Sequence, residues 1–180
     1  MELLIMIDMQ NDFTTGVLGN PQTAAVVSNV CKEIKAYKKK NSSLPLIYTM
    51  DTHYDDYMDT QEGKNLPVPH CIEGTQGWEL PEEIKDALVD VNTIMVKKNT
   101  FGGKNLIARL DLLMKDYQID SIKLMGVCTD ICVISNAMLI KAFFPEIPIT
   151  VKRLCCAGVT PESEETAIKA MQSCQIKIEE

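Results

Sequence analysis

Cys132 lies where a thiol could act as a nucleophile. Residues 127–132 (VCTDIC) join an apolar, strand-like run to a segment with helical spacing. Thr129 is a good helix-capping residue and Asp130 is favourable in a first helical turn, so Cys132 is expected in that turn. The helix dipole and the free backbone N–H groups there lower the pKa of a thiol, and the same N–H groups could hold an oxyanion.

Cys128 and Cys132 have two other interpretations. Both could be buried, inert thiols, because free cysteine is among the most buried residue types. They could also form a redox pair, since they stand four residues apart and Cys155 and Cys156 follow later in the chain. The demanding geometry of a disulfide on a fixed strand-to-helix turn argues against that pair.

Two charged positions could assist the thiol. Asp8 directly follows the apolar residues 3–7 (LLIMI). A carboxylate at the mouth of a sheet has its pKa raised by desolvation and can serve as a general base, although an aspartate that only caps the turn remains an alternative. Lys97 and Lys98 end another apolar run, where a lysine could stabilise a thiolate or an anionic intermediate, or simply lie on the surface.

A group of possible metal ligands lies in one long segment. The chain has two histidines, His53 and His70, and Asp51 stands two residues before the first of them. Two imidazoles and one carboxylate, with coordination positions left open, suit a catalytic divalent transition metal. Histidines that only pack or cap loops are the alternative.

Strand-like and helix-like segments alternate along the chain and must position these residues. Apolar runs of strand length occupy residues 3–7, 44–48, 93–96, 121–127 and 147–151, with a weaker one at 175–178. Helical spacing occupies residues 23–39, 81–88, 106–117, 130–143 and 161–171. This alternation predicts an α/β fold, a single-domain, doubly wound, six-stranded parallel sheet with helices on both faces. Ligands bind such sheets at the carboxyl ends of the strands, and the aperiodic residues 51–80 leave one of those ends.

Composition narrows the class of protein. The chain has 180 residues, of which 46% are hydrophobic and 24% charged, which favours one folded domain over residues 1–180. Its net charge of −7 and dispersed basic residues argue against nucleic acid or an anionic membrane as a partner. No apolar run approaches the roughly 20 residues that span a bilayer and no signal peptide is evident, so we expect a cytoplasmic protein. Seven cysteines in mostly apolar segments argue against a disulfide framework.

Five motifs, in this order along the chain, resemble those of the isochorismatase-like cysteine hydrolases, and the metal motif resembles the nicotinamidase branch. They are residues 7–13 (IDMQNDF), Asp51-x-His53, Pro69-His70-Cys71, Lys98-x-Thr100-Phe101-Gly102 and residues 126–133 (GVCTDICV). The resemblance extends over most of the chain, from the first predicted strand to the start of the last predicted helix.

The resemblance implies roles for particular residues. It implies a catalytic triad of Asp8, Lys98 and Cys132, and a divalent metal on Asp51, His53 and His70. Zinc is the first expectation, with manganese or iron as alternatives, and either Glu62 or water as a fourth ligand. It also implies a cis peptide bond between Val127 and Cys128, with nearby amides forming an oxyanion hole, so both residues are expected to contact substrate.

Lys98 is preferred to Lys97 for the triad. The lysine of the family stands three residues before an aromatic residue, as Lys98 does before Phe101. Side chains alternate along a strand, so only one of the two lysines can reach the site, and Lys97 is the alternative.

The implied reaction is hydrolysis of nicotinamide to nicotinate and ammonia through a thioester. One departure concerns the pocket: nicotinamidases commonly carry an aromatic residue before a Pro-Pro-His segment, whereas residues 66–70 here read LPVPH. Phe13 could form one wall of the pocket instead, and Trp78 is the only tryptophan. The alternatives are hydrolysis of another small amide or of isochorismate, or a member that only binds small molecules. Family members often form homo-oligomers, and the sequence leaves this open.

Overall fold

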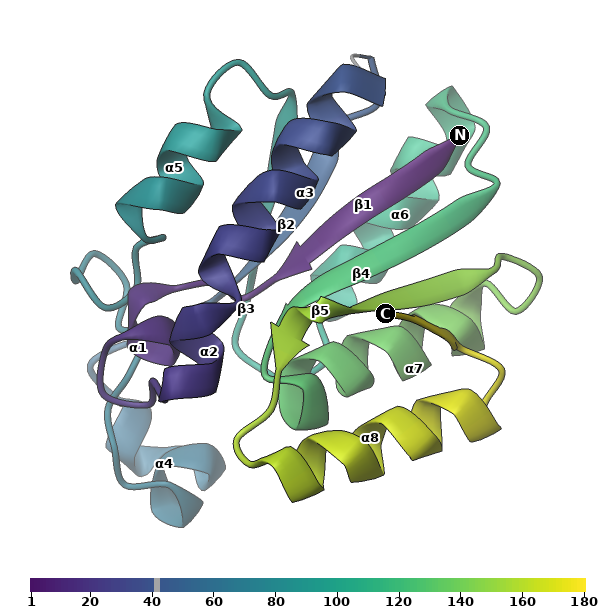
Figure 1. The fold of residues 1–180 in the computed structure, drawn as a ribbon. Helices are drawn as coiled ribbons and strands as arrows, with labels where there is room; N and C mark the ends of the chain where they lie inside the picture. The colour runs from purple at the N-terminus through teal and green to yellow at the C-terminus, as the bar shows by residue number, and fades with distance from the viewer. Residues whose placement is uncertain (41–42) are drawn as a thin grey trace.

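A parallel β-sheet runs through the middle of the molecule, with helices on both of its faces (Figure 1). The computed structural model describes residues 1–40 and 43–180. In this part of the chain the sheet has six strands in the order β3-β2-β1-β4-β5-β6, and every neighbouring pair is parallel. The strands are β1 (Glu2–Ile7), β2 (Leu46–Asp51), β3 (Thr93–Lys98), β4 (Ser121–Val127), β5 (Ile149–Ala157) and β6 (Lys177–Glu179). The predicted doubly wound fold is therefore confirmed.

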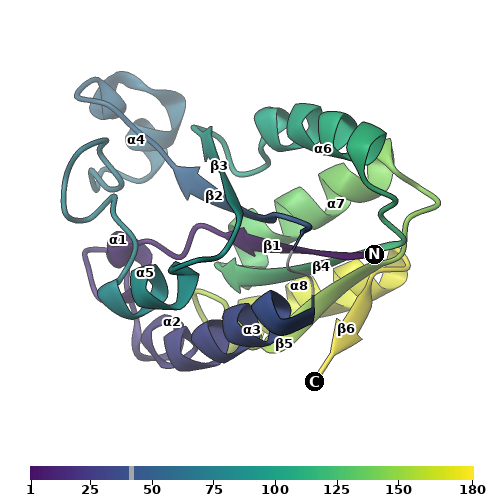
Figure 2. The same ribbon diagram turned by 90° about the horizontal axis from the view of Figure 1, so that it is seen from above.

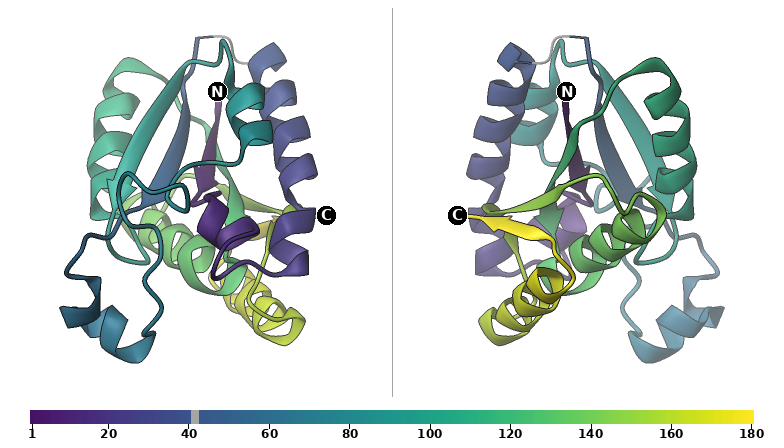
Figure 3. Two further views of the ribbon diagram at one scale, coloured as in Figure 1. Left: turned by 90° about the vertical axis from the view of Figure 1, so that its left-hand side faces the viewer. Right: turned by 90° about the vertical axis from the view of Figure 1, so that its right-hand side faces the viewer.

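The helices form two outer layers. On one face lie α3 (Val27–Lys40) and α5 (Glu82–Leu88), and on the other lie α6 (Lys104–Asp116) and α7 (Ile134–Phe143) (Figure 2). Helix α8 (Pro161–Ser173) packs beside α7 and β6. The short elements α1 (Asn11–Thr14), α2 (Pro21–Ala25), the 3₁₀ turn Tyr57–Asp59 and α4 (Gln61–Asn65) belong to the connections, and α4 stands beyond the ends of the strands (Figure 3).

The central strands are buried on both faces, which explains the unbroken apolar run of β1 and the mostly apolar sequence of β4, where Lys123 is the one charged residue. Residues Leu3 to Ile7 of β1 are at most 1% exposed, and β4 is buried from Ile122 to Val127. A parallel strand covered by helices on both sides has no face on which polar residues would be favourable. Helix α3 covers one side of this core with Val30, Ile34 and Tyr37.

Several boundaries differ from the predicted ones, among them that of β5, which extends from Ile149 to Ala157 where residues 147–151 were predicted. Strand β2 begins at Leu46, because Pro45 has no N–H to donate to β3 and the first pairing bond runs from Leu46 N to Asn92 O at 2.9 Å. The predicted helix 23–39 is two helices, since Asn20 caps a separate short helix through a capping box. The aperiodic residues 51–80 contain α4 and a 3₁₀ turn, so they are not a structureless loop.

Two further expectations concern the whole chain. All seven cysteines are free in the described residues, as expected without a disulfide framework. Among those residues, no helix has both the length and the apolar character needed to cross a bilayer.

Candidate active site

The carboxyl ends of four neighbouring strands bring together the predicted triad. Asp8 follows β1, Asp51 and Lys98 are the last residues of β2 and β3, and Cys132 lies in the turn after β4. Asp51 pairs with Lys98 in the register of β2 and β3. The chain leaves β1 and β4 toward opposite faces, and this opens a crevice at the ends of those strands.

Lys98 lies at the centre of this group. Its Nζ is 2.6 Å from Asp8 Oδ2, 3.3 Å from Asp51 Oδ1 and 3.6 Å from Cys132 Sγ. Thr49 Oγ1 donates to the other oxygen of Asp8 at 2.6 Å and orients that carboxylate. The amine of Lys98 therefore contacts two carboxylates and a thiol at once.

Lys97 points away from this group. Its Nζ pairs with Glu73 and lies 5.3 Å from the ring centroid of Trp78. The indole N–H of Trp78 donates to Thr52 Oγ1 at 2.9 Å. The structure thus places Lys98 in the site and Lys97 outside it, as strand alternation requires.

Burial controls the protonation of the three residues. Burial raises the pKa of Asp8, and the charge of Asp51 adds to this, although Lys98 acts in the opposite direction. Burial would lower the pKa of Lys98, but Asp8, Cys132 and Asp51 outweigh it and raise that pKa well above its usual value. The Lys98 amine is accordingly a permanent cation in this site.

The pKa of Cys132 differs from the expectation. Burial raises the pKa of the Cys132 thiol well above its ordinary value, and Lys98 offsets this only in part. Its position at the start of a helix predicted a lowered thiol pKa. Burying a thiolate beside Asp8 and Asp51 costs more free energy than the helix start can offset. The thiol is therefore protonated at rest and needs a base, and Asp8, which contacts the same Lys98 amine, is the candidate.

The turn that carries Cys132 is wider than an ordinary helical turn. Residues Thr129–Val133 form one π-helical turn that continues into α7. Cys128, and not the predicted Thr129, is the capping residue, and its carbonyl accepts from the N–H groups of Ile131 and Val133 at 3.1 and 3.0 Å. The Thr129 hydroxyl is buried and has no hydrogen-bond partner among the described residues. The Val127–Cys128 peptide bond is cis, as the resemblance implied.

A second cluster adjoins the triad. Asp51, His53, Glu62 and His70 each offer a ligand atom, and these four atoms lie within 4.8 Å of one another. His53 Nε2 is 3.2 Å from Asp51 Oδ2 and 3.7 Å from Glu62 Oε1, and His70 Nε2 is 3.6 and 3.8 Å from the same oxygens. Two imidazole nitrogens and two carboxylate oxygens fit a divalent transition metal.

Hydrogen bonds around the cluster orient His70 and hold the helix that carries Glu62. His70 Nδ1 is 2.9 Å from Val68 O, which leaves Nε2 directed at the cluster. Glu62 comes from α4, where Thr60 caps the helix by accepting from Gly63 N at 3.0 Å. Glu62 was one of two candidates for a fourth ligand, and the structure places it beside the other three.

Asp51 belongs to both clusters. One carboxylate oxygen contacts Lys98 and the other faces His53 and His70. Burial would raise the pKa of Asp51, but Lys98 and the two histidines outweigh it and hold that pKa below its usual range. The carboxylate is therefore ionised, as both a lysine partner and a metal ligand must be.

Gln10 holds Asp51 in place and was not among the residues predicted for the site. Its side chain is fully buried, accepts from Asp51 N at 2.7 Å and donates to Asp51 O at 2.8 Å. It also donates to Trp78 O at 2.9 Å. Its sequence position could have indicated this role, because a polar residue in a buried segment close to Asp8 must find hydrogen-bond partners inside the protein.

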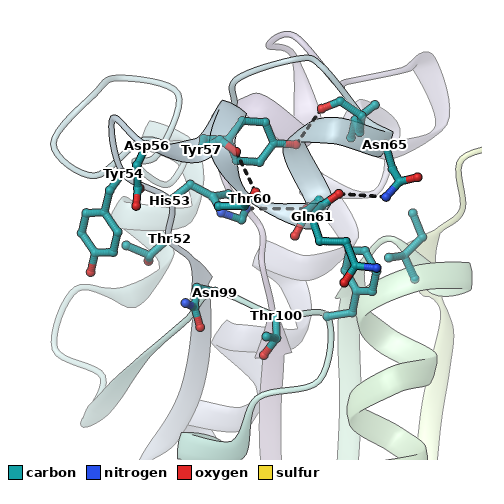
Figure 4. A pocket seen from close by; sticks show the side chains of 14 residues that line it. Thr52, His53, Tyr54, Asp56, Tyr57, Thr60, Gln61, Asn65, Asn99 and Thr100 are labelled. Carbon is teal, nitrogen blue, oxygen red and sulfur yellow. Dashed lines mark hydrogen bonds and ion pairs between the residues drawn. The ribbon is translucent and has the colours of Figure 1, made fainter.

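A cavity of about 730 Å³ opens beside the metal cluster. Figure 4 shows His53 at its centre, Tyr54 and Asp56 on one side, Gln61 and Asn65 on the other, and Asn99 and Thr100 across the opening. Its apolar lining comes from Tyr54, Tyr57, Leu66, Phe101 and Ile131. Tyr54 and Phe101 are about half exposed, so two aromatic rings are free to contact a bound molecule.

The three residues expected to contact substrate are not among those that line this cavity. Phe13 is 8% exposed and packs edge-on against His70, with 5.5 Å between ring centroids. Val127 and Cys128 are buried at the end of β4. Phe101, which was not predicted to contact substrate, lines the cavity instead.

Comparison with protein families and curated proteins agrees with this geometry. A family model described as isochorismatase domain matches residues 2–179. The chain is 28% identical over 179 residues to an uncharacterized isochorismatase family protein, PncA, of Bacillus subtilis, covering 92% of this chain and 91% of that protein. It is 23% identical over 192 residues to a nicotinamidase/pyrazinamidase of Mycobacterium tuberculosis, covering 99% and 98%.

Solved structures agree as well. The nicotinamidase PncA from Bacillus subtilis superposes with a TM-score of 0.83 at 25% identity, over 99% of both chains. The pyrazinamidase of Pyrococcus horikoshii in complex with zinc superposes with a TM-score of 0.77 at 25% identity, over 98% of this chain and 97% of that one.

Proposed function

The chain belongs to the isochorismatase domain family, and on this premise we propose that it hydrolyses nicotinamide to nicotinate and ammonia. The observation that carries the proposal is the position of Lys98 Nζ, 2.6 Å from Asp8 Oδ2 and 3.6 Å from Cys132 Sγ, next to a cluster of four metal-ligand groups. A buried acid, a buried cation and a thiol in contact provide a nucleophile with its base.

The first half of the reaction forms a thioester. Asp8 takes the proton of the Cys132 thiol as the sulfur attacks the carboxamide carbon. Backbone N–H groups around Cys128 and Cys132 stabilise the oxyanion of the tetrahedral intermediate. The bond between carbon and nitrogen then breaks, and Asp8 returns the proton to the leaving nitrogen, which departs as ammonia.

The second half releases the acid. Asp8 takes a proton from water as the water oxygen attacks the thioester carbon. The bond between carbon and sulfur breaks, and the sulfur recovers its proton from Asp8. Throughout both halves, the Lys98 cation offsets the negative charge that passes between Asp8 and Cys132.

Asp51, His53, Glu62 and His70 are the residues that would hold the metal. When bound, a divalent metal would supply a Lewis acid that binds and orients the pyridine nitrogen, directly or through water. Zinc is the first candidate, supported by the zinc complex of the similar pyrazinamidase, and manganese and iron are the alternatives. The aromatic rings of Tyr54 and Phe101 at the cavity provide apolar surface for the substrate ring.

Ammonia release by the purified protein tests this function. Wild type should release ammonia from nicotinamide, and Cys132→Ala should abolish the release while the protein stays folded. Cys174→Ala is the matched control, because that thiol is exposed at the end of α8 and should leave turnover unchanged. Retained turnover in Cys132→Ala would contradict the assigned nucleophile.

Another small carboxamide is the second candidate substrate. Leu66 lines the cavity where an aromatic residue commonly precedes the histidine in nicotinamidases, so the ring-binding surface differs here. Turnover of nicotinamide, pyrazinamide and an aliphatic amide should be compared in one assay. Cys132-dependent turnover of another amide, with none of nicotinamide, would refute the substrate assignment and retain the reaction type.

A further inference from the structure

Asn136 is a fully buried polar residue in α7 that the proposed reaction does not use. Its Oδ1 accepts from Gly103 N at 2.9 Å, and its Nδ2 donates to Phe101 O at 3.0 Å and to Cys132 O at 2.8 Å. A side-chain amide has two donors and one acceptor group, and here each donor and the acceptor has a backbone partner. A buried polar side chain whose hydrogen-bonding groups are all satisfied makes the local structure rigid.

The three partners come from two segments, which carry two of the three proposed catalytic residues, Lys98 and Cys132. Cys132 O belongs to the turn after β4, one of whose residues supplies the proposed nucleophile. Phe101 and Gly103 belong to the connection that follows Lys98 at the end of β3. Asn136 therefore links the lysine strand to the cysteine turn, which are not joined by backbone pairing between β3 and β4.

The connection after β3 also lies against the lysine side chain. A Cβ added to Gly103 would stand 3.5 Å from Lys98 Cδ and 3.6 Å from Asn136 Oδ1. The Gly103 backbone therefore lies close to both the amide and the aliphatic part of Lys98. Any shift of this backbone relative to α7 changes the space that holds the amine 3.6 Å from Cys132 Sγ.

We propose that Asn136 is a positioning residue, which sets the distance between Lys98 and Cys132 by tying the 101–103 backbone to the cysteine turn. The proposal rests on the roles proposed for those two residues. Because its bond to Phe101 O also places the Phe101 backbone at the cavity, one amide aligns the nucleophile, its cation and one wall of the pocket.

Two substitutions distinguish the hydrogen bonds to the 101–103 backbone from the hydrogen bond to Cys132 O. In Asn136→Ser, the hydroxyl can still donate to the carbonyl four residues earlier, Cys132 O, but is too short to bridge to Phe101 and Gly103. Asn136→Leu removes all three bonds. Asn136→Ser is the variant that keeps the test decisive if the leucine variant fails to fold.

Asn20→Ser is the matched control. Asn20 caps α2 by accepting from Thr23 N at 2.8 Å and bridges to Gly158 O at 3.2 Å. Serine can still cap the helix but cannot reach Gly158, so this variant also loses a bridging amide, at a residue that contacts neither Lys98 nor Cys132.

Two measurements on the folded fraction of each variant test the proposal. The first is kcat and KM with a carboxamide substrate, and the second is the rate at which iodoacetamide alkylates Cys132, followed by mass spectrometry. In Asn136→Ser and Asn136→Leu, kcat should fall roughly 10- to 100-fold and by more than KM rises, because misplaced reacting groups lose rate steeply. Alkylation of Cys132 should slow by a similar factor, and Asn20→Ser should match wild type in both.

Each result decides the question. Equal alkylation of Cys132 in wild type and the Asn136 variants, including no alkylation in any of them, would overturn the proposal. Slower turnover with unchanged alkylation would overturn it too, since Asn136 would then act on the substrate alone. If wild type hydrolyses no carboxamide, the proposed function fails, while the alkylation comparison still tests the position of Cys132.

Discussion

At the scale of single residues, Lys98 holds the candidate site together electrostatically. It is 4% exposed and lies between the carboxylates of Asp8 and Asp51, which are themselves buried. Two buried carboxylates so close to one cation would repel each other without it. The same cation offsets the cost of forming a thiolate at Cys132, so stability and the proposed reaction depend on one amine.

Replacing Lys98 should therefore affect both properties. Lys98→Met keeps most of the side-chain volume but leaves Asp8 and Asp51 buried without their cation. We expect turnover to fall to background and the free energy of unfolding to drop by about 3 to 5 kcal/mol, the usual cost of removing one partner of a buried pair. Urea unfolding measured beside a turnover assay checks both.

Lys97→Met is the control for this substitution. Lys97 is an exposed neighbour whose partner, Glu73, also lies near the surface, so its loss should change the free energy of unfolding far less than the loss of Lys98 does. Similar losses in the two variants would contradict the central place given to Lys98.

At the scale of elements, close packing between neighbouring segments determines where the site residues lie. Strand β4 approaches β1 at Gly126, which has a φ of +125° and stands opposite Ile7. A Cβ there would lie 2.1 Å from Ile7 O, so only glycine fits. This contact occurs one residue before Asp8 and just before the cysteine turn.

Gly126→Ala should separate these two strands. Both the positive φ and the clash with backbone oppose alanine, so we expect a loss of about 2 to 4 kcal/mol in the free energy of unfolding and reduced turnover. Gly102→Ala is the comparison, because a Cβ there would make an ordinary contact of 3.4 Å with Ser135 O. A loss no larger in Gly126→Ala than in Gly102→Ala would contradict this account.

Helix α3 offers a test based on pH. Tyr37 is 4% exposed, its hydroxyl lies 3.4 Å from the carbonyls of Leu44 and Pro45, and burial raises the pKa of its phenol to about 12. The unfolded chain would ionise this tyrosine near pH 10, whereas the folded chain would keep it protonated. Above the unfolded pKa the unfolded state therefore binds fewer protons, and stability falls as the pH rises from about 10 to 12.

Tyr37→Phe isolates this contribution. The variant should be less stable than wild type at pH 8 because it loses the hydroxyl contact, and this difference should shrink as the pH approaches 12. Chemical unfolding of both proteins at several pH values measures the difference. A difference that stays constant with pH would mean that the phenol titrates normally in the folded protein.

At the scale of the whole molecule, the metal-ligand cluster connects the sheet to the long connection after β2. Asp51 ends that strand, whereas Glu62 and His70 come from the connection itself, which includes α4. Binding a metal that the unfolded chain binds less well would stabilise the folded state by mass action. It would also restrain α4, which stands beyond the sheet (Figure 1).

Metal removal should therefore destabilise the protein as a whole. Protein purified without chelator should contain a divalent metal by elemental analysis, and chelation should lower Tm and turnover together. The double variant His53→Ala/His70→Ala should lack the metal and show no further change in Tm on chelation. Metal retained at the wild-type amount in that variant would refute the ligand set.

The sequence by itself determined the six strands, the longer helices and the identity of the candidate residues, but not the short helices α1 and α4. Apolar runs and helical spacing are local properties, so they predicted the strand and helix alternation, and this placed Asp8, Lys98 and Cys132 at strand ends. The ends of individual elements were less well predicted, because pairing with a neighbouring strand decided where β2 begins and how far β5 extends.

Only the tertiary structure decided how these residues act on one another. It brought Glu62 of α4 to the histidines, showed that burial raises the pKa of Cys132 where the helix start had predicted a lowered one, and revealed the link through Asn136. The physical reason is that desolvation and long-range contacts depend on what packs around a residue. Spacing along the chain identifies which residues could do chemistry, whereas packing determines their charge and their partners.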